Sequence, residues 1–228
     1  MRQYSIDARN IKNPIYPCPI QMGGKNANGQ MLSIGNYYLS LDGKPFFGIC
    51  GEAHFSRINR ELWEDEIIKM KAGGLNMIAT YIFWIHHEEI EGTFDFSGNK
   101  DLRLFLELCK KNHMYVILRI GPFSHGECRN GGFPDWIYGQ PFDIRCDDPS
   151  YLYYTRRFYE QIYQQAKGLL FKDNGPVIGV QLENEHEHAS CPWEMTTENS
   201  KEWVVSGHDG KNHMSTLKKI AKEVGFDV

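Results

Sequence analysis

Carboxylate and amide side chains gather in one short segment of the chain, PVIGVQLENEHEH, which spans residues 176–188. Its apolar first half predicts a buried strand, and successive side chains of a strand point to opposite faces. Gln181, Glu183 and Glu185 are therefore expected on one face. Asn184 is expected on the other face, with its apolar neighbours. Unpaired carboxylates are costly to bury, so this segment is not a simple core strand.

Two roles are open to the carboxylates of this segment. In the first, a carboxyl group at the strand end acts as a general acid or base on a bound substrate. In the second, the role is structural: Glu183 pairs with a core basic residue such as Arg119, and Glu185 merely reaches solvent. The cost of burial favours the structural role for Glu183 and the chemical role for Glu185.

The elements that must position these residues alternate along the chain. Apolar runs rich in β-branched and aromatic residues predict four strands, and amphipathic runs between them predict four helices. The strands are expected at 47–54, 76–84, 114–120 and 176–184, and the helices at 61–74, 101–112, 151–170 and 212–225. An Asp42-Gly43 pair ahead of the first strand predicts a β-hairpin. Four strand–helix repeats indicate a parallel α/β fold.

The connections between these elements are unequal, which narrows the fold class. Those from helix to strand are short, whereas those from strand to helix are long and hold the aromatic, histidine and carboxylate residues, as on the active face of a barrel. The glycine-rich phosphate turn of a doubly wound sheet is missing from the sequence. We therefore expect an α/β fold, a (β/α)8 TIM-type barrel, of which the chain covers about the first four β/α units.

The four expected β/α units also suggest how the chain is divided into regions. Residues 1–35 are polar, with several prolines, and are expected to form an irregular lead-in. Residues 36–228 are expected to form the N-terminal half of the catalytic domain, stopping before barrel strand five.

Composition excludes several classes of protein. The 228 residues include 25 Lys and Arg against 29 Asp and Glu, a net charge of −4, so no nucleic-acid partner is expected. No apolar stretch approaches the roughly 18 residues of a spanning helix, so no membrane insertion is expected. The six cysteines lack a CxxC pair, which argues against a zinc ribbon. The N-terminus lacks the apolar core of a signal peptide, which leaves the localisation open.

The ends of the other three strands carry related chemistry. Glu52 and His54 follow the first strand, Tyr81 ends the second, and a loop with His125 and Glu127 follows the third. Hydroxyl, carboxylate and imidazole groups beside aromatic faces suit an uncharged sugar ring, because the polar groups grip hydroxyls while the aromatic faces stack on the ring.

Four segments, in this order and spacing, resemble glycoside hydrolase family 35, the β-galactosidase family. They read FFGICGEAHFSR, GGLNMIATYIFWIHHE, LRIGPFSHGE with GGFP, and GPVIGVQLENE. The resemblance spans about residues 36–188. It implies a retaining enzyme on a (β/α)8 barrel that cleaves a terminal β-linked sugar, with a β-galactoside favoured. It also implies a secreted or periplasmic location, and neither a cofactor nor a metal.

The resemblance implies roles for individual residues. Glu185 takes the place of the family's general acid/base, and Asn184 that of its contact to the sugar 2-hydroxyl. The implied substrate-binding residues are Tyr81, His125, Gly126, Glu127 and Asn184. An enzyme that retains the anomeric configuration needs a second carboxylate about 5–5.5 Å from the first. The family's nucleophile follows barrel strand seven, so we expect it outside this chain and the isolated chain to be inactive.

Four positions depart from the family pattern and affect sugar contacts more than reaction type. They are Ile85 for Asn, His125 for Cys, Cys128 for Trp, and His186 for Tyr or Phe.

Two other functions stay open. A non-catalytic carbohydrate-binding fragment would keep the fold without turnover. A metal-dependent TIM-barrel hydrolase would use His86 and His87, or His186 and His188, as ligands, although loop histidines are more often solvated or hydrogen-bonded. The expected partners are an oligosaccharide or β-galactoside substrate and the remainder of the barrel.

Overall fold

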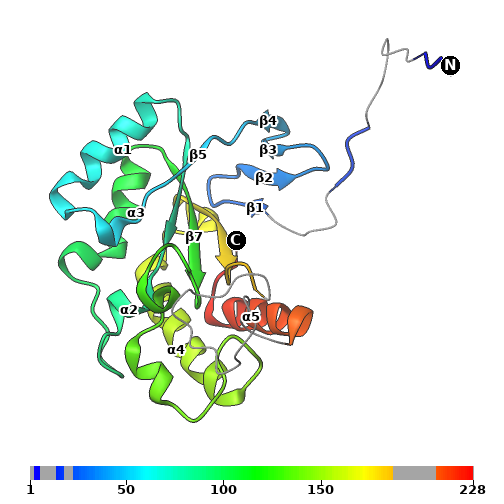
Figure 1. Ribbon diagram of the computed structural model, residues 1–228. Coiled ribbons are helices and arrows are strands. Elements are labelled where there is room, and N and C mark those ends of the chain that lie inside the picture. The colour runs from blue at the N-terminus through cyan, green and yellow to red at the C-terminus, as the bar shows by residue number, and fades with distance from the viewer. Residues whose placement is uncertain (1–2, 6–13, 18–22, 187–208, 228) are drawn as a thin grey trace.

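The computed structural model contains two four-stranded sheets (Figure 1). It describes residues 3–5, 14–17, 23–186 and 209–227. One sheet is parallel, with the order β5-β6-β7-β8. Its strands are β5 (Cys50–Glu52), β6 (Met77–Tyr81), β7 (Tyr115–Gly121) and β8 (Val177–Leu182). Strands that follow one another in the chain are also neighbours in space, as in consecutive units of a β/α barrel.

Helices connect these strands and pack beside one another along one face of the parallel sheet (Figure 1). They are α1 (Trp63–Ala72), α3 (Leu102–Lys111), α4 (Pro149–Ala166) and α5 (Gly210–Val224), with the single turn α2 (Trp84–His87) after β6. Short 3-10 helices lie at Phe55–Arg57, Arg60–Leu62, Gly98–Lys100, Arg129–Gly132, Asp135–Gly139 and Phe171–Asp173. The predicted α/β fold of TIM-barrel type is confirmed in these four units.

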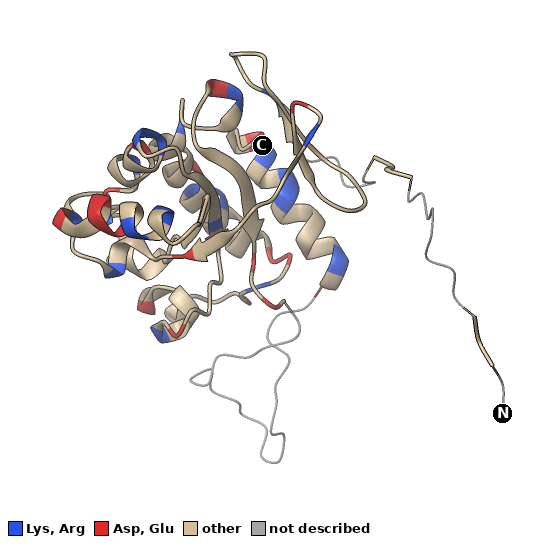
Figure 2. Ribbon diagram, turned by 90° about the horizontal axis from the view of Figure 1, so that it is seen from above, with Lys and Arg blue, Asp and Glu red and all other residues tan. Residues whose placement is uncertain are grey.

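Local sequence explains where two of these helices begin. The Asp101 carboxylate accepts a hydrogen bond from the backbone N–H of Leu104 at 2.9 Å, and Asp148 accepts one from Ser150 at 2.8 Å. Each satisfies an amide that the first helical turn leaves without a partner. Charged residues lie along the helices, whereas the strands carry few of them (Figure 2).

The main core lies between this helix layer and the parallel sheet. Val116, Leu118 and Ile120 of β7 are buried and belong to one cluster with side chains from the helices. Ile117 and Arg119 alternate with them and are only half-buried on the opposite face, here called the open face. One strand thus supplies both the core and the floor of a separate region.

The second sheet is antiparallel and covers the open face where the parallel strands begin. It consists of β1 (Gly23–Lys25), β2 (Met31–Ile34), β3 (Leu39–Leu41) and β4 (Lys44–Phe46). The hairpin predicted at Asp42-Gly43 is confirmed, because these two residues join β3 to β4 with φ angles of 52° and 73°. Both angles fall in the left-handed region that this type of tight turn requires.

The expectation of an irregular lead-in over residues 1–35 is wrong for β1 and β2. Leu32 pairs with Leu41 across the sheet, and its side chain packs with Met77 and Ile178 of the parallel sheet. These strands are short and without clear alternation, so their pairing depends on tertiary contacts rather than on local propensity. The domain boundary at residue 36 stays a prediction.

None of the helices in the described part of the chain is long and apolar enough to span a bilayer.

Candidate active site

Polar residues from several strand ends meet on the open face. The Tyr81 hydroxyl and the Arg119 guanidinium both donate hydrogen bonds to Oδ1 of Asn184, at 2.9 Å each. Arg119 also lies over the Tyr81 ring, 3.6 Å from its centroid, and forms an ion pair with Glu52. Glu52 ends β5, Tyr81 ends β6, and Asn184 follows β8, so the carboxyl ends of the parallel strands build this cluster.

The electrostatics keep Tyr81 protonated. Burial raises the pKa of its phenol to about 12, although the Arg119 guanidinium opposes the rise. The carboxylates of Glu52, Glu185 and Glu127 raise the pKa of Tyr81 further. The hydroxyl is therefore a hydrogen-bond donor at neutral pH, as its contact with Asn184 requires.

His54 completes the wall of the cluster beside Tyr81. The backbone N–H of Tyr81 donates to Nδ1 of His54 at 3.3 Å, and the two rings are 5.1 Å apart. Burial lowers the pKa of His54, while the nearby Glu52 carboxylate acts against it. A neutral imidazole with Nδ1 accepting leaves Nε2–H as the donor, which lies 3.9 Å from Glu52.

The predicted residues after β7 lie next to Tyr81. A Cβ added to Gly126 would lie 3.0 Å from the Phe83 ring and 3.2 Å from the Tyr81 ring. A larger residue would need the two rings to shift by a few tenths of an ångström, and the φ of 51° also favours glycine. His125 is half-buried and packs at 6.1 Å from the Phe123 ring, whereas Glu127 is exposed.

Glu183 makes a buried ion pair, but its partner is Arg145 rather than the expected Arg119. Arg145 donates from Nε at 2.9 Å and from Nη2 at 2.8 Å to the two carboxylate oxygens, and these side chains are 0% and 1% exposed. The backbone N–H of Asn184 donates to the same carboxylate at 2.8 Å. Arg119 is engaged with Glu52 and Asn184 instead.

The faces predicted for residues 181–185 are therefore wrong after Leu182. The strand ends there, and Glu183 has a φ of 57° while Glu185 has a φ of 47°. These left-handed residues break the two-residue alternation, so Asn184 joins Tyr81 on the open face and Glu183 turns toward Arg145. Glu185 stays exposed beside Asn184.

Of the predicted residues, the structure thus brings Tyr81, Gly126 and Asn184 into direct contact with one another or with a shared neighbour. Glu127 and Glu185 are exposed carboxylates whose negative charges raise the pKa of Tyr81. Sequence reasoning named His54 only among the polar groups at the strand ends, did not single out Arg145, and gave Arg119 a different partner. Glu52 and Arg119 share the face of Tyr81 in the strand register, a signal that could have identified them. Arg145 lies on a loop and offered no comparable signal.

The histidines considered as metal ligands lie in different surroundings. His86 contacts the Ser56 hydroxyl at 2.9 Å. His87 is buried, contacts the Asp95 carbonyl at 3.0 Å and stacks on Phe96 at 4.4 Å. Among the described residues, the group with metal-ligand spacing is Glu183, His186 and His213. Neither His86 nor His87 belongs to this group. His188 lies outside the described residues.

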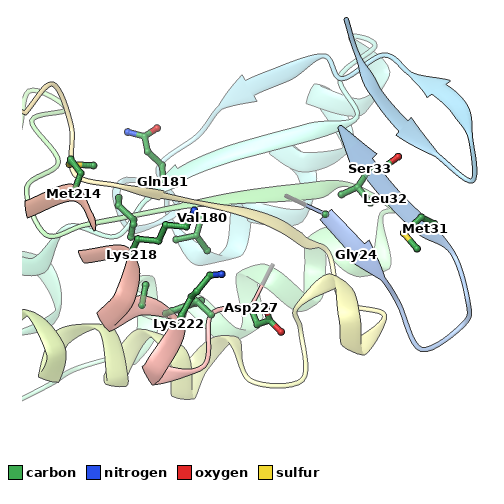
Figure 3. A pocket seen from close by; sticks show the side chains of 14 residues that line it. Gly24, Met31, Leu32, Ser33, Val180, Gln181, Met214, Lys218, Lys222 and Asp227 are labelled. Carbon is green, nitrogen blue, oxygen red and sulfur yellow. The ribbon is translucent and has the colours of Figure 1, made fainter. Parts of the chain in front are cut away.

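A cavity of about 770 Å³ lies apart from this cluster, between β2, β8 and α5 (Figure 3). Leu32, Val180 and Phe226 supply apolar lining, and Lys218 and Lys222 of α5 supply charge. It shares Val180, Gln181 and Leu182 with the segment of residues 176–188. It lies along the edge of β8 that has no neighbouring strand among the described residues, and none of the predicted sugar-binding residues lines it.

Several β-galactosidases are similar to this chain in sequence. The β-galactosidase of Xanthomonas manihotis is 37% identical over 169 residues, which are 74% of this chain and 28% of that protein. The β-galactosidase of Homo sapiens is 39% identical over 167 residues, which are 72% of this chain and 25% of that protein. The chain thus spans about a quarter of the length of these relatives.

Solved structures share the fold. The endo-1,4-β-mannanase of Rhizomucor miehei superposes with a TM-score of 0.56 at 13% identity, covering 85% of this chain and 57% of that one. A GH5_18 from Bifidobacterium longum subsp. infantis superposes with a TM-score of 0.54 at 11% identity, covering 76% of this chain and 38% of that one. At such identities the likeness concerns the fold alone.

The family comparison covers the region just described. The match to glycosyl hydrolases family 35 runs over residues 38–224. It therefore includes all four parallel strands together with the contact between Tyr81 and Asn184. By its sequence, the chain belongs to glycosyl hydrolases family 35.

Proposed function

We propose that this chain supplies the acid/base half of the active site of a retaining β-glycosidase. The observation that carries the proposal is the cluster in which Tyr81 and Arg119 hold Asn184, directly beside the exposed carboxylate of Glu185. The cluster lies at the carboxyl ends of parallel strands, where barrel enzymes keep their catalytic groups. The names of the relatives favour a terminal β-linked galactose as the substrate.

Asn184 is oriented for binding a sugar hydroxyl. Its Oδ1 accepts from both Tyr81 and Arg119, which leaves the amide NH2 as the group that can donate to a ligand. We assign that donor to the sugar 2-hydroxyl, a contact that strengthens in glycosidase transition states. Tyr81, Gly126, Glu127 and His125 then form the surrounding sugar site.

Glu185 performs two proton transfers in this scheme. As an acid, it protonates the glycosidic oxygen while a nucleophilic carboxylate attacks the anomeric carbon and forms a covalent glycosyl intermediate. As a base, it then takes a proton from the water that hydrolyses this intermediate. We place the nucleophile in a part of the protein that this chain, about a quarter of its relatives' length, does not include.

The test is Glu185→Gln in the protein that contains both carboxylates. We expect its turnover of an alkyl β-galactoside to fall by about 10³-fold or more, because general acid–base catalysis contributes about 10²–10⁴-fold. A dinitrophenyl β-galactoside should lose much less in its first step, because its leaving group departs without a proton. Galactose binding should survive.

Glu107→Gln is the matched control, because Glu107 is an exposed carboxylate on α3. Added azide should accelerate the Glu185→Gln variant and give a β-galactosyl azide, since azide attacks the intermediate without a base. Unchanged turnover in Glu185→Gln, or an α-configured azide product, would contradict the acid/base role. Sugar binding with no turnover in the unmodified protein would identify a non-catalytic binding module instead.

A further inference from the structure

Two histidines, His186 and His213, meet beside Glu183. The rings of His186 and His213 are 4.9 Å apart between centroids. One donor atom from each of Glu183, His186 and His213 lies within 4.8 Å of the others. His186 follows β8 and His213 lies in the first turns of α5, so the two elements converge on this point.

His213 carries the observation that points to a ligand. Its side chain is fully buried, and Nδ1 contacts Oδ1 of Asp147 at 2.9 Å. The other oxygen of Asp147 accepts a hydrogen bond from the Thr216 hydroxyl at 3.2 Å, so the carboxylate is held in place. Nδ1–H is thus the donor, and the lone pair is on Nε2. This buried nitrogen has no hydrogen-bond partner among the described residues.

Buried polar atoms without a partner are rare, and a water molecule or an ion that belongs at the site is one explanation for them. A carboxylate that accepts from one ring nitrogen, while the other nitrogen faces further donors, is the usual surrounding of a metal-bound histidine. We propose that Glu183, His186 and His213 bind a divalent transition-metal ion, with zinc as the preferred ion.

The donor types select zinc over harder cations. Two imidazoles and one carboxylate suit zinc, whereas magnesium and calcium prefer oxygen ligands alone. Zinc bonds of about 2.0–2.2 Å place tetrahedral ligands closer together than the present spacing, so the side chains must move inward by about 1 Å. Arg145 stays paired with Glu183 and neutralises it, while Asp147 adds negative charge behind His213.

The site is structural rather than catalytic. Glu183 and His186 flank Asn184 and Glu185 in the chain, so an ion there would fix both ends of that dipeptide and tie it to α5. This positioning effect rests on the proposed function, whereas ion binding itself does not.

The experiment uses the untagged chain, stripped with EDTA and dialysed against zinc chloride or magnesium chloride. We expect about one zinc ion per chain by elemental analysis, no retained magnesium, and a higher melting temperature with zinc. Cobalt should give the visible absorption bands of a tetrahedral site. A chain without stoichiometric zinc would overturn the proposal.

Variants locate the ion. His186→Gln and His213→Gln should each abolish stoichiometric zinc and the cobalt bands, and Asp147→Asn should weaken zinc binding by about 10–100-fold. His113→Asn is the control and should keep full zinc, because His113 is an exposed residue between α3 and β7. Circular dichroism establishes folding, and His186→Gln alters a half-buried residue if the His213 variant unfolds. Equal zinc in wild type and His186→Gln would overturn the assignment, whatever the result of the glycosidase assays.

Discussion

The two faces of the parallel sheet use the same strands for opposite purposes. Toward the helices, β7 presents Val116, Leu118 and Ile120, which are completely buried. Toward the open face it presents Ile117 and then Arg119, half-buried, as the strand nears its carboxyl end. The first face provides stability through burial, and the second provides a polar cluster that the core holds in position.

Glu183 shows the same contrast at the end of β8. It directly follows this strand, yet its side chain is buried with the core and not exposed on the open face. Its carboxylate and Arg145 are buried together, and Arg145 also stacks on Phe123 of the main core at 3.6 Å. Glu185, two residues later, is exposed. Glu183 is thus part of the buried core, whereas Glu185 is the glutamate to which we assign proton transfer.

The largest effect on stability is expected from Arg145→Met. It leaves the Glu183 carboxylate buried without its counter-charge, and we expect unfolding free energy to fall by about 3–5 kcal/mol. Urea unfolding followed by circular dichroism measures this loss. Arg129→Met is the control, because its ion pair with Asp135 is exposed and should contribute less than about 1 kcal/mol. Equal losses in the two variants would contradict the division between the two glutamates.

The next largest effect is expected from a comparison of two adjacent residues of β7, Leu118 and Ile117. Leu118→Ala removes a fully buried side chain from the helix-covered face, and we expect a loss of about 2–5 kcal/mol. Ile117→Ala removes a half-buried side chain from the open face and should lose clearly less. The same urea titration decides: an equal or larger loss for Ile117→Ala would mean that the smaller cluster on the open face, against which Ile117 packs, contributes as much stability as the main core.

The smallest expected effect is a pH dependence of the unfolding free energy, caused by the buried His87. Burial lowers the pKa of His87 to about 4, against about 6.5 in an unfolded chain. As pH falls from 6.5 toward 4, His87 becomes protonated in the unfolded state but stays neutral in the folded state. Stability contributed by this site is therefore lost with falling pH, by about 2 kcal/mol between pH 7 and 5.

Replacing His87 with Phe tests this sign, because the ring can still stack on Phe55 and Phe96 without titrating. The variant should show a flatter dependence of unfolding free energy on pH between 7 and 5. A slope equal to that of the wild-type chain would assign the acid sensitivity to other groups.

Much of the fold could be predicted because its signals are local. The alternation of apolar and amphipathic runs and the Asp42-Gly43 turn each act within a few residues, and the structure has both. The strand pair β1–β2 escaped prediction, because its two short segments become strands through contact with β3 and the parallel sheet.

The candidate site shows the same limit. Tyr81 and Asn184 could be named in advance from their motifs, and they touch as a shared site requires. The partner of Glu183 could not, since Arg145 lies 38 residues earlier on an irregular loop. Nor could the meeting of His186 with His213, which requires α5 to pack beside the end of β8.

The sequence by itself determined the class of fold, the family and the set of polar residues at the strand ends, because these depend on residue type and order. The tertiary structure alone decided which face each residue reached. Two left-handed residues after Leu182 end the alternation that sequence reasoning extends, and they send Glu183 to Arg145 and Asn184 to Tyr81. Backbone turns of this kind follow from the contacts they permit, and those contacts come from distant parts of the chain.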